Sequence, residues 1–148
     1  MKKKYFIKVI LLLSFITTFS STQLYSQCNS FVKKTCNYKI SPFTENGQSN
    51  TKTLTAGEKV ILNVTLLAGQ VYRILVCSEE ILGIVSFKVI DATGGILFDS
   101  SKNGQLDFWD FRMKSSQTVK IEINAPLSSS TSSVLPSGCV SIIVGFKN

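Results

Sequence analysis

The feature that most constrains the fold is a regular alternation of apolar and polar residues, which recurs from residue 59 almost to the C-terminus. The alternating or apolar segments are 59–67, 71–77, 85–89, 96–98, 106–113, 119–123 and 140–146. A period of two places one face of a strand on a core and the other in water. No segment has apolar residues at helical spacing over the length that a helix needs. The sequence therefore predicts an all-β domain, an antiparallel β-sandwich of the jelly-roll kind with about seven or eight strands.

The N-terminus has a different character. Three lysines follow the initial Met, and the run Val9–Phe19 is apolar apart from small hydroxyl residues. This run is shorter than the roughly 20 residues of a membrane-spanning helix, and its order is typical of a secretory signal peptide. We expect residues 1–26 to be that signal peptide, cleaved after Ser26 or, alternatively, near Ser20 and Ser21. The mature chain would then have no transmembrane segment and would lie in the periplasm, at the cell surface or outside the cell.

The residues beyond the signal peptide suffice for one domain with a single core. We expect residues 27–53 to form an N-terminal extension and loop, and residues 54–148 to form the sandwich. Within the first part, Ser41–Thr53 is polar with a Pro and a Gly and predicts a long surface loop. The serine-rich Pro126–Gly138 predicts a flexible connection between the last two strands.

Most of the positive charge belongs to the expected signal peptide. The whole chain has 16 Lys and Arg against 9 Asp and Glu, a formal net charge of +7. Four of these basic residues and no acidic residue precede residue 27, so 12 minus 9 leaves +3 for the mature chain. The remaining basic residues are scattered, with Lys33-Lys34 as the one adjacent pair. This distribution argues against a nucleic-acid partner.

All four cysteines lie beyond the signal peptide, which predicts disulfides in an oxidising compartment. A zinc site is disfavoured because there is no CxxC pair and no histidine. Cys77 ends one expected strand and Cys139 begins another, both on the side away from the core, so we expect a Cys77–Cys139 bridge and a local Cys28–Cys36 bridge. Lipidation of Cys28 is an alternative, although Gln27 stands where a lipobox needs a small residue.

The absence of histidine removes the commonest general base and the Ser-His-Asp and Cys-His arrangements. Neither GxSxG nor SxxK is present. Two carboxylate pairs, Glu79 with Glu80 and Asp107 with Asp110, are the remaining candidates for hydrolysis. Glu79 and Glu80 are typical of a turn, and Asp107 and Asp110 would point to opposite faces of a strand. We therefore expect no catalytic residues and no enzymatic activity.

A candidate calcium loop occupies Asp99–Asp110, DSSKNGQLDFWD. Oxygen-bearing side chains fall at positions 1, 3, 5, 9 and 12 of that loop: Asp99, Ser101, Asn103, Asp107 and Asp110. Gly104 falls at position 6, where a calcium loop turns. Asp99, Asn103 and Asp107 are thus the candidate ligands, and calcium is the one candidate cofactor. A plain turn between two strands explains the same residues more simply.

Phe108-Trp109-Asp110-Phe111 suggests a second binding chemistry, because exposed aromatic rings on a β-sandwich can stack on sugar rings. The alternation puts Trp109 and Phe111 on one face and Phe108 on the other. At least one of these faces must be core, so the alternative is that these rings are buried.

Several short motifs resemble a family of short exported proteins from Bacteroidota. They are Ala56-Gly57-Glu58, residues 67–74, Phe87–Asp91, residues 95–100, Trp109–Phe111 and Ser137–Val140. The middle of the chain is also similar, more loosely, to the bacterial pre-peptidase C-terminal (PPC) type of β-sandwich. The resemblance covers residues 54–146. The first family carries no assigned activity, and the second implies a non-catalytic accessory, binding or adhesion role.

Together these observations predict an exported, non-catalytic β-sandwich that acts by binding. A cell-surface glycan or an envelope protein is the kind of partner that fits such a location. The alternatives are a calcium-dependent or carbohydrate-binding module and, in a third class, an unrecognised hydrolase.

Overall fold

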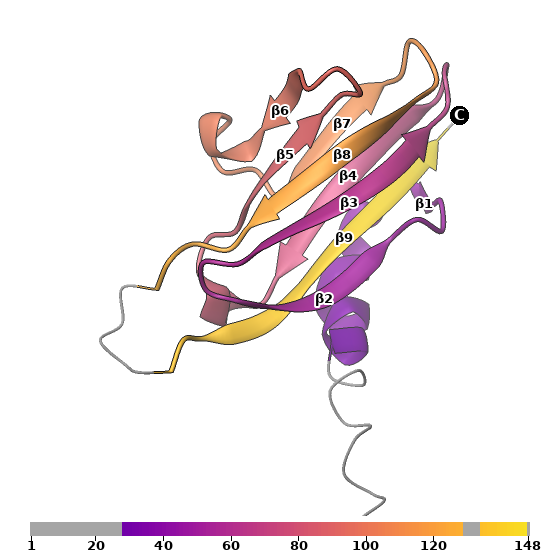
Figure 1. Ribbon diagram of the computed structural model, residues 1–148. Coiled ribbons are helices and arrows are strands. Elements are labelled where there is room, and N and C mark those ends of the chain that lie inside the picture. The colour runs from indigo at the N-terminus through magenta and orange to yellow at the C-terminus, as the bar shows by residue number, and fades with distance from the viewer. Residues whose placement is uncertain (1–27, 129–133, 148) are drawn as a thin grey trace, which may run out of the picture.

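The protein is an antiparallel β-sandwich, which confirms the predicted fold class (Figure 1). The computed structural model describes residues 28–128 and 134–147, so the expected signal peptide and part of the serine-rich connection lie outside the described residues. One sheet has the order β1 (Thr44–Glu45), β9 (Ser137–Lys147), β4 (Val71–Ser78) and β7 (Phe108–Arg112), and β2 (Asn50–Thr55) also pairs with β9. The other has the order β3 (Lys59–Leu66), β8 (Gln117–Asn124), β5 (Ser86–Ile90) and β6 (Ile96–Asp99).

The main core lies between the two sheets and is built by the alternation seen in the sequence. In β3 and β8 the paired residues Val64 and Val119 are fully buried, while Thr65 and Thr118, also paired, face solvent. Phe87 and Phe98 fill the space between the sheets, with ring centroids 5.2 Å apart. Full burial of such a side chain stabilises the fold by about 1.5–3 kcal/mol. Within the described residues, no helix is long and apolar enough to cross a membrane.

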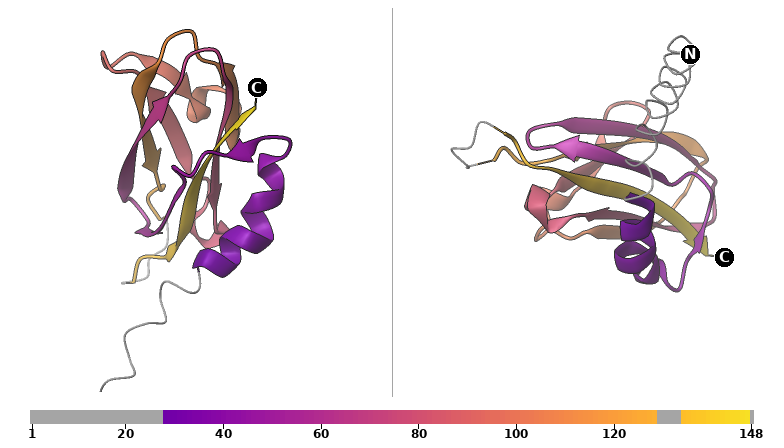
Figure 2. Two further views of the ribbon diagram at one scale, coloured as in Figure 1. Left: turned by 90° about the vertical axis from the view of Figure 1, so that its right-hand side faces the viewer. Right: turned by 90° about the horizontal axis from the view of Figure 1, so that it is seen from below.

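A helical segment over residues 28–40, which the sequence did not predict, covers the outer face of the β4–β9 sheet (Figure 2). It includes η1 (Val32–Cys36) and η2 (Asn37–Ile40). Its buried residues pack with Phe43 on Leu75 and Ile143, forming a second, smaller core. A side chain at Gly145 of β9 would lie 2.8 Å from Cβ of Phe43. The missing side chain there lets the segment approach the sheet.

The loop predicted over Ser41–Thr53 is shorter than expected, because β2 already begins at Asn50. The expected boundary between residues 53 and 54 therefore falls inside this strand. β2 has the sequence NTKTLT and only one fully buried side chain, that of Leu54. Its pairing comes from β9, with Thr53 opposite Cys139. An edge strand held by backbone pairing carries little apolar alternation, which explains why the pattern failed here.

The disulfides join Cys28 to Cys139 and Cys36 to Cys77, so the predicted pairing was wrong although all four cysteines are bridged. β4 and β9 are antiparallel neighbours as expected, but their register places Cys77 opposite Ser141. Cys139 lies further along the sheet, and the helical segment crosses above both positions. Each strand cysteine therefore meets a cysteine of the segment instead of the other strand.

Candidate functional site

An open groove of about 770 Å³ lies at the end of the β4–β9 sheet where β4 finishes. The helical segment forms one wall, with Phe31, Thr35 and Lys39. The loop that contains η3 (Glu80–Leu82) forms the opposite wall, and the connection between η4 (Ser100–Lys102) and β7 closes one end. Figure 1 shows β4 ending beside the helical segment.

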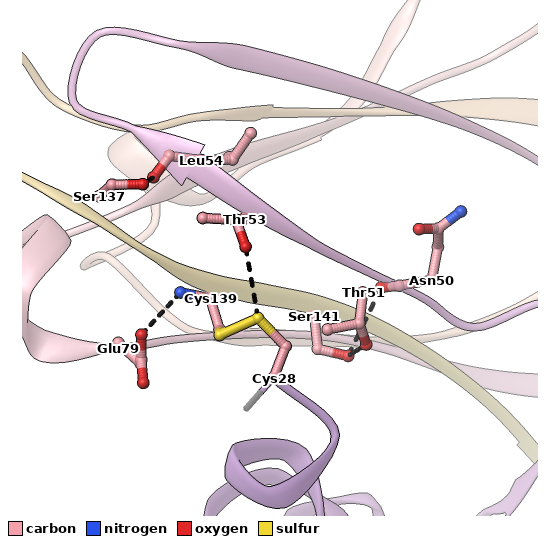
Figure 3. Close-up of a disulfide and its surroundings, with 9 residues drawn as sticks. All are labelled: Cys28, Asn50, Thr51, Thr53, Leu54, Glu79, Ser137, Cys139 and Ser141. Atoms are coloured by element: carbon pink, nitrogen blue, oxygen red, sulfur yellow. Dashed lines mark hydrogen bonds between the residues drawn. A yellow bond between two sulfur atoms is a disulfide. The ribbon is translucent and has the colours of Figure 1, made fainter. Parts of the chain in front are cut away.

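The two disulfides hold the helical wall on the sheet. Cys28–Cys139 joins the start of the segment to the beginning of β9, and the Thr53 hydroxyl lies 3.5 Å from the Cys28 sulfur (Figure 3). Cys36–Cys77 anchors the middle of the segment on β4. Because Cys28 is bonded to Cys139, its sulfur is not available for the thioether of a lipid anchor. The alternative of a lipidated Cys28 is therefore contradicted.

Arg73 fixes the far end of the same wall. Its guanidinium binds Asp110 through two hydrogen bonds of 2.7 Å, and Nη1 donates to the carbonyl oxygens of Lys39 and Ser41 at 3.0 Å. The hydrogen bonds with Asp110 raise the pKa of Arg73 above its ordinary value. The guanidinium also lies 4.7 Å from the ring centroid of Phe43. The planar guanidinium of Arg73 thus joins β4 to the backbone at the end of the helical segment.

Lys39 crosses the groove to the opposite end. Its Nζ donates to Asp107 at 2.9 Å, and this hydrogen bond raises the pKa of Lys39 above its ordinary value. The pair connects the helical segment to the residue that precedes β7. Both side chains are more than a third exposed, so the pair contributes at most about 1 kcal/mol to stability. A pair of this kind can open when a partner competes for either charge.

The η3 wall combines apolar and acidic side chains. Glu79 Oε2 accepts the N–H of Cys139 at 2.8 Å (Figure 3). The Glu79 N–H in turn donates to the Cys139 carbonyl at 2.9 Å. This exchange locks the start of the η3 loop onto β9. Ile81 and Ile84 nevertheless remain 61% and 63% exposed. Glu80 beside them makes no ion pair within the part of the chain that the structure describes.

The residues of the candidate calcium loop do not converge on one point. Asp99 is buried and accepts hydrogen bonds from the Ser101 side chain and N–H, which lower its pKa. Asn103 donates to the Asp99 carbonyl, while Asp107 binds Lys39. Across residues 28–128 and 134–147 no group of three or more His, Cys, Asp or Glu could hold a metal ion. Calcium binding stays a prediction, and calorimetry without heat at millimolar calcium would exclude it.

The aromatic run Phe108–Phe111 is divided between the two cores. Trp109 stacks on Phe98 and on Phe111, with centroids 5.2 and 4.0 Å away, and all three pack with the main core. Phe108 lies under the Arg73 guanidinium at 4.6 Å. These rings are therefore partly buried against the two cores, and carbohydrate binding stays a prediction.

Three of the four carboxylates considered for hydrolysis are tied to other partners. Asp107 binds Lys39 and Asp110 binds Arg73, while Glu79 caps β9. The groove itself was not predicted from the sequence. A signal for it exists in residues 79–84, EEILGI, where apolar residues follow two acidic ones without strand alternation.

The chain is thus a two-layer β-sandwich with a disulfide-anchored helical cover and an open, partly acidic groove beside it. No family model matches the sequence, and no curated protein matches it. Among solved structures the chain is similar to PliG of Aeromonas hydrophila, a periplasmic lysozyme inhibitor of g-type lysozyme. The TM-score is 0.48 and the sequence identity 10%, over 67% of this chain and 84% of that chain. So distant a likeness says nothing about what this chain binds.

Proposed function

We propose that this chain is an exported, non-catalytic binding protein and that the groove is where its partner binds. The observation that carries the proposal is the pair of exposed isoleucines, Ile81 and Ile84, on the wall of a groove of about 770 Å³. Concave sites lined by apolar groups with a few polar ones are the usual places for ligands.

Export is supported by the two disulfides, since such bonds persist in the periplasm and outside the cell and are rare in the cytosol. The expected signal peptide at residues 1–26 agrees with that location. The partner is accordingly sought among molecules of the cell envelope and its surroundings.

The groove is also pre-organised, which favours binding. Its helical wall is cross-linked at Cys28 and Cys36, and its other wall is locked through Glu79. A rigid site loses little conformational entropy when a partner binds. Burying the exposed parts of Ile81 and Ile84 against a partner would then contribute most of the affinity, as apolar anchors do at other interfaces.

A non-catalytic role is supported by the chemistry available in the groove. The chain has no histidine. The groove carboxylates Glu79 and Asp107 are already hydrogen-bonded to Cys139 N–H and to Lys39. Turnover of any member of a panel of glycan and peptide substrates would contradict this part of the proposal.

Site-specific photo-crosslinking tests the location of the site. A photoreactive residue at position 84 should form adducts with an envelope component, and adding Ile81→Asp to that variant should abolish the adducts. The control position is Ile61 on the outer face of β3, which is 50% exposed but lies on the other sheet. Equal adducts from positions 61 and 84, or adducts at position 84 that Ile81→Asp leaves unchanged, would overturn the proposal.

A further inference from the structure

We propose that the groove takes an extended, basic peptide segment, which adds as a short strand to the free edge of β4. This inference rests on the proposed function, because it names the kind of partner for the same groove. It is carried by the backbone groups that β4 leaves unpaired, by the walls on either side of them and by the charge of the groove.

The edge of β4 becomes free before the strand ends. β7 pairs with β4 from Val71, which lies opposite Arg112, to Leu75, which lies opposite Phe108. The last backbone hydrogen bond on this side of β4 joins the Val76 N–H to the Asp107 carbonyl at 2.7 Å. On its other side β4 stays paired with β9 as far as Ser78 opposite Val140.

The unpaired groups point toward the groove. Successive residues of a strand direct their backbone groups to alternate sides. The Val76 N–H bonds Asp107 on the β7 side, and the Glu79 N–H bonds Cys139 of β9 on the opposite side. Ser78 lies two residues after Val76, so its N–H and C=O also face the β7 side, where no strand remains. Neither these groups nor the Val76 C=O have a hydrogen-bond partner in the described part of the chain. Val76, Cys77 and Ser78 all line the groove.

A tight turn of the chain itself keeps this edge open. The Ser100 carbonyl accepts the N–H groups of both Asn103 and Gln105. Gly104 and Gln105 then have φ values of 67° and 57°, and Gln105 is the one non-glycine residue of the described chain with positive φ. Residues other than Gly, Asn and Asp rarely adopt such a conformation. β7 begins only at Phe108, so the residues before Asp107 form no strand along the edge of β4.

Three other edge strands, β3, β6 and β7, carry features that discourage pairing. On β3, the side-chain amide of Gln48 bonds both backbone groups of Thr65, at 2.9 and 3.0 Å, as a neighbouring strand would. β7 is an edge strand that contains the charged residues Asp110 and Arg112, and β6 is only 4 residues long. Charges and short strands are the ways in which proteins discourage pairing at edges.

The walls of the groove suit the alternating side chains of an added strand. On one side of the β4 edge lies the helical segment, with Phe31 and Thr35, and on the other lie Ile84 and Val85. Side chains of a bound strand would point alternately toward these two walls. Backbone pairing with pockets for alternate side chains is the established mode of strand addition.

Charge selects the partner. Three carboxylates, those of Glu79, Glu80 and Asp107, line the groove against the single ammonium of Lys39. Glu79 and Asp107 have hydrogen-bonded partners, whereas Glu80 has no ion pair among the described residues. An extended segment with Lys or Arg among aliphatic residues matches this surface.

Synthetic peptides test the inference on the whole, unmodified protein. The probe is a fluorescein-labelled hexapeptide of alternating Val and Lys, followed by fluorescence anisotropy. We expect it to bind at least about tenfold more tightly than the Val–Glu counterpart, and N-methylation of alternate backbone nitrogens to weaken it by at least about tenfold. Hydrogen exchange of the Ser78 N–H should slow when the Val–Lys peptide binds. Glu80→Lys leaves two carboxylates against two ammonium groups in the groove and should abolish the charge preference, whereas the control Glu45→Lys, on β1, should leave it unchanged.

The outcomes separate this inference from the proposed function. Equal binding of the N-methylated peptides, or an unchanged Ser78 exchange rate, would overturn strand addition. A preference for Val–Glu would overturn the charge argument. If no peptide binds while position 84 still crosslinks an envelope component, the inference is wrong and the binding groove stands. If crosslinking at position 84 also fails, the proposed function falls with it.

Discussion

The disulfide pairing can be tested by comparing three double variants that differ only in which cysteines they lack. Cys28→Ala with Cys139→Ala removes one bridge, and Cys36→Ala with Cys77→Ala removes the other. Cys77→Ala with Cys139→Ala removes one cysteine from each bridge, so neither native bond can form. Under the pairing expected from the sequence, that third variant would instead lack a single bridge.

The size of each effect follows from the loop that a bridge closes. The bridges span 111 and 41 residues of the sequence. Restricting the unfolded chain by loops of these lengths corresponds to about 4–5 kcal/mol and about 4 kcal/mol at 25 °C in the chain-entropy treatment. A small domain is stable by about 5–15 kcal/mol in total. Losing one bridge should therefore leave a marginal fold, and losing both should leave little folded protein.

Urea unfolding under non-reducing conditions measures these differences, and thiol titration in denaturant reports the free cysteines. We expect the variant that lacks Cys77 and Cys139 to be the least stable of the three. We expect no free thiol in the variant that lacks Cys36 and Cys77, because Cys28 and Cys139 remain bridged. If that variant were instead the least stable, or if it contained two free thiols, the pairing and the anchoring of the helical segment would be refuted.

Three further predictions concern single residues. Arg73→Ala should lower the free energy of unfolding by about 2–3 kcal/mol, because it removes charge-assisted hydrogen bonds to Asp110 and to the helical segment; Arg73→Lys should restore only part of this in urea unfolding. Because the pKa of Asp99 is lowered in the folded protein, its carboxylate contributes fully to the free energy of unfolding above the ordinary carboxyl pKa. This contribution is lost as the pH falls through the pKa that Asp99 has in the folded state. Asp99→Asn should therefore reduce the fall in the free energy of unfolding at acidic pH. An unchanged dependence on pH would contradict this role of Asp99. Trp109 should emit at short wavelength and resist acrylamide quenching, since it stacks between two phenylalanines; a solvent-like emission would contradict that packing.

The strands of the sandwich could be predicted because their information is local. In β8, Val119, Ile121 and Ile123 are buried, and the polar residues between them are not. That alternation is written in consecutive residues and determines which face of the strand is apolar. The turn at Asp91–Gly95 is local in the same way, since Asp91 accepts hydrogen bonds from Thr93 and Gly95 within the turn.

The helical segment and β2 could not be predicted because what holds them lies far away in the sequence. Residues 28–40 contain few apolar residues at helical spacing, and two disulfides and a close approach to Gly145 hold them in place. β2 is a polar strand whose order comes from pairing with β9. Propensity alone is a weak guide where tertiary contacts decide the conformation.

The sequence by itself determined the fold class, the main core and the fact that all four cysteines would be bridged. These properties depend on residue type and period, which are visible without knowing the neighbours in space. Only the tertiary structure decided which cysteines meet and where a groove opens. The β4–β9 register places Cys77 opposite Ser141, and β7 leaves the sheet before β4 ends. Register and strand ends are set by contacts between distant segments, so the candidate site depends on a packing that no local pattern records.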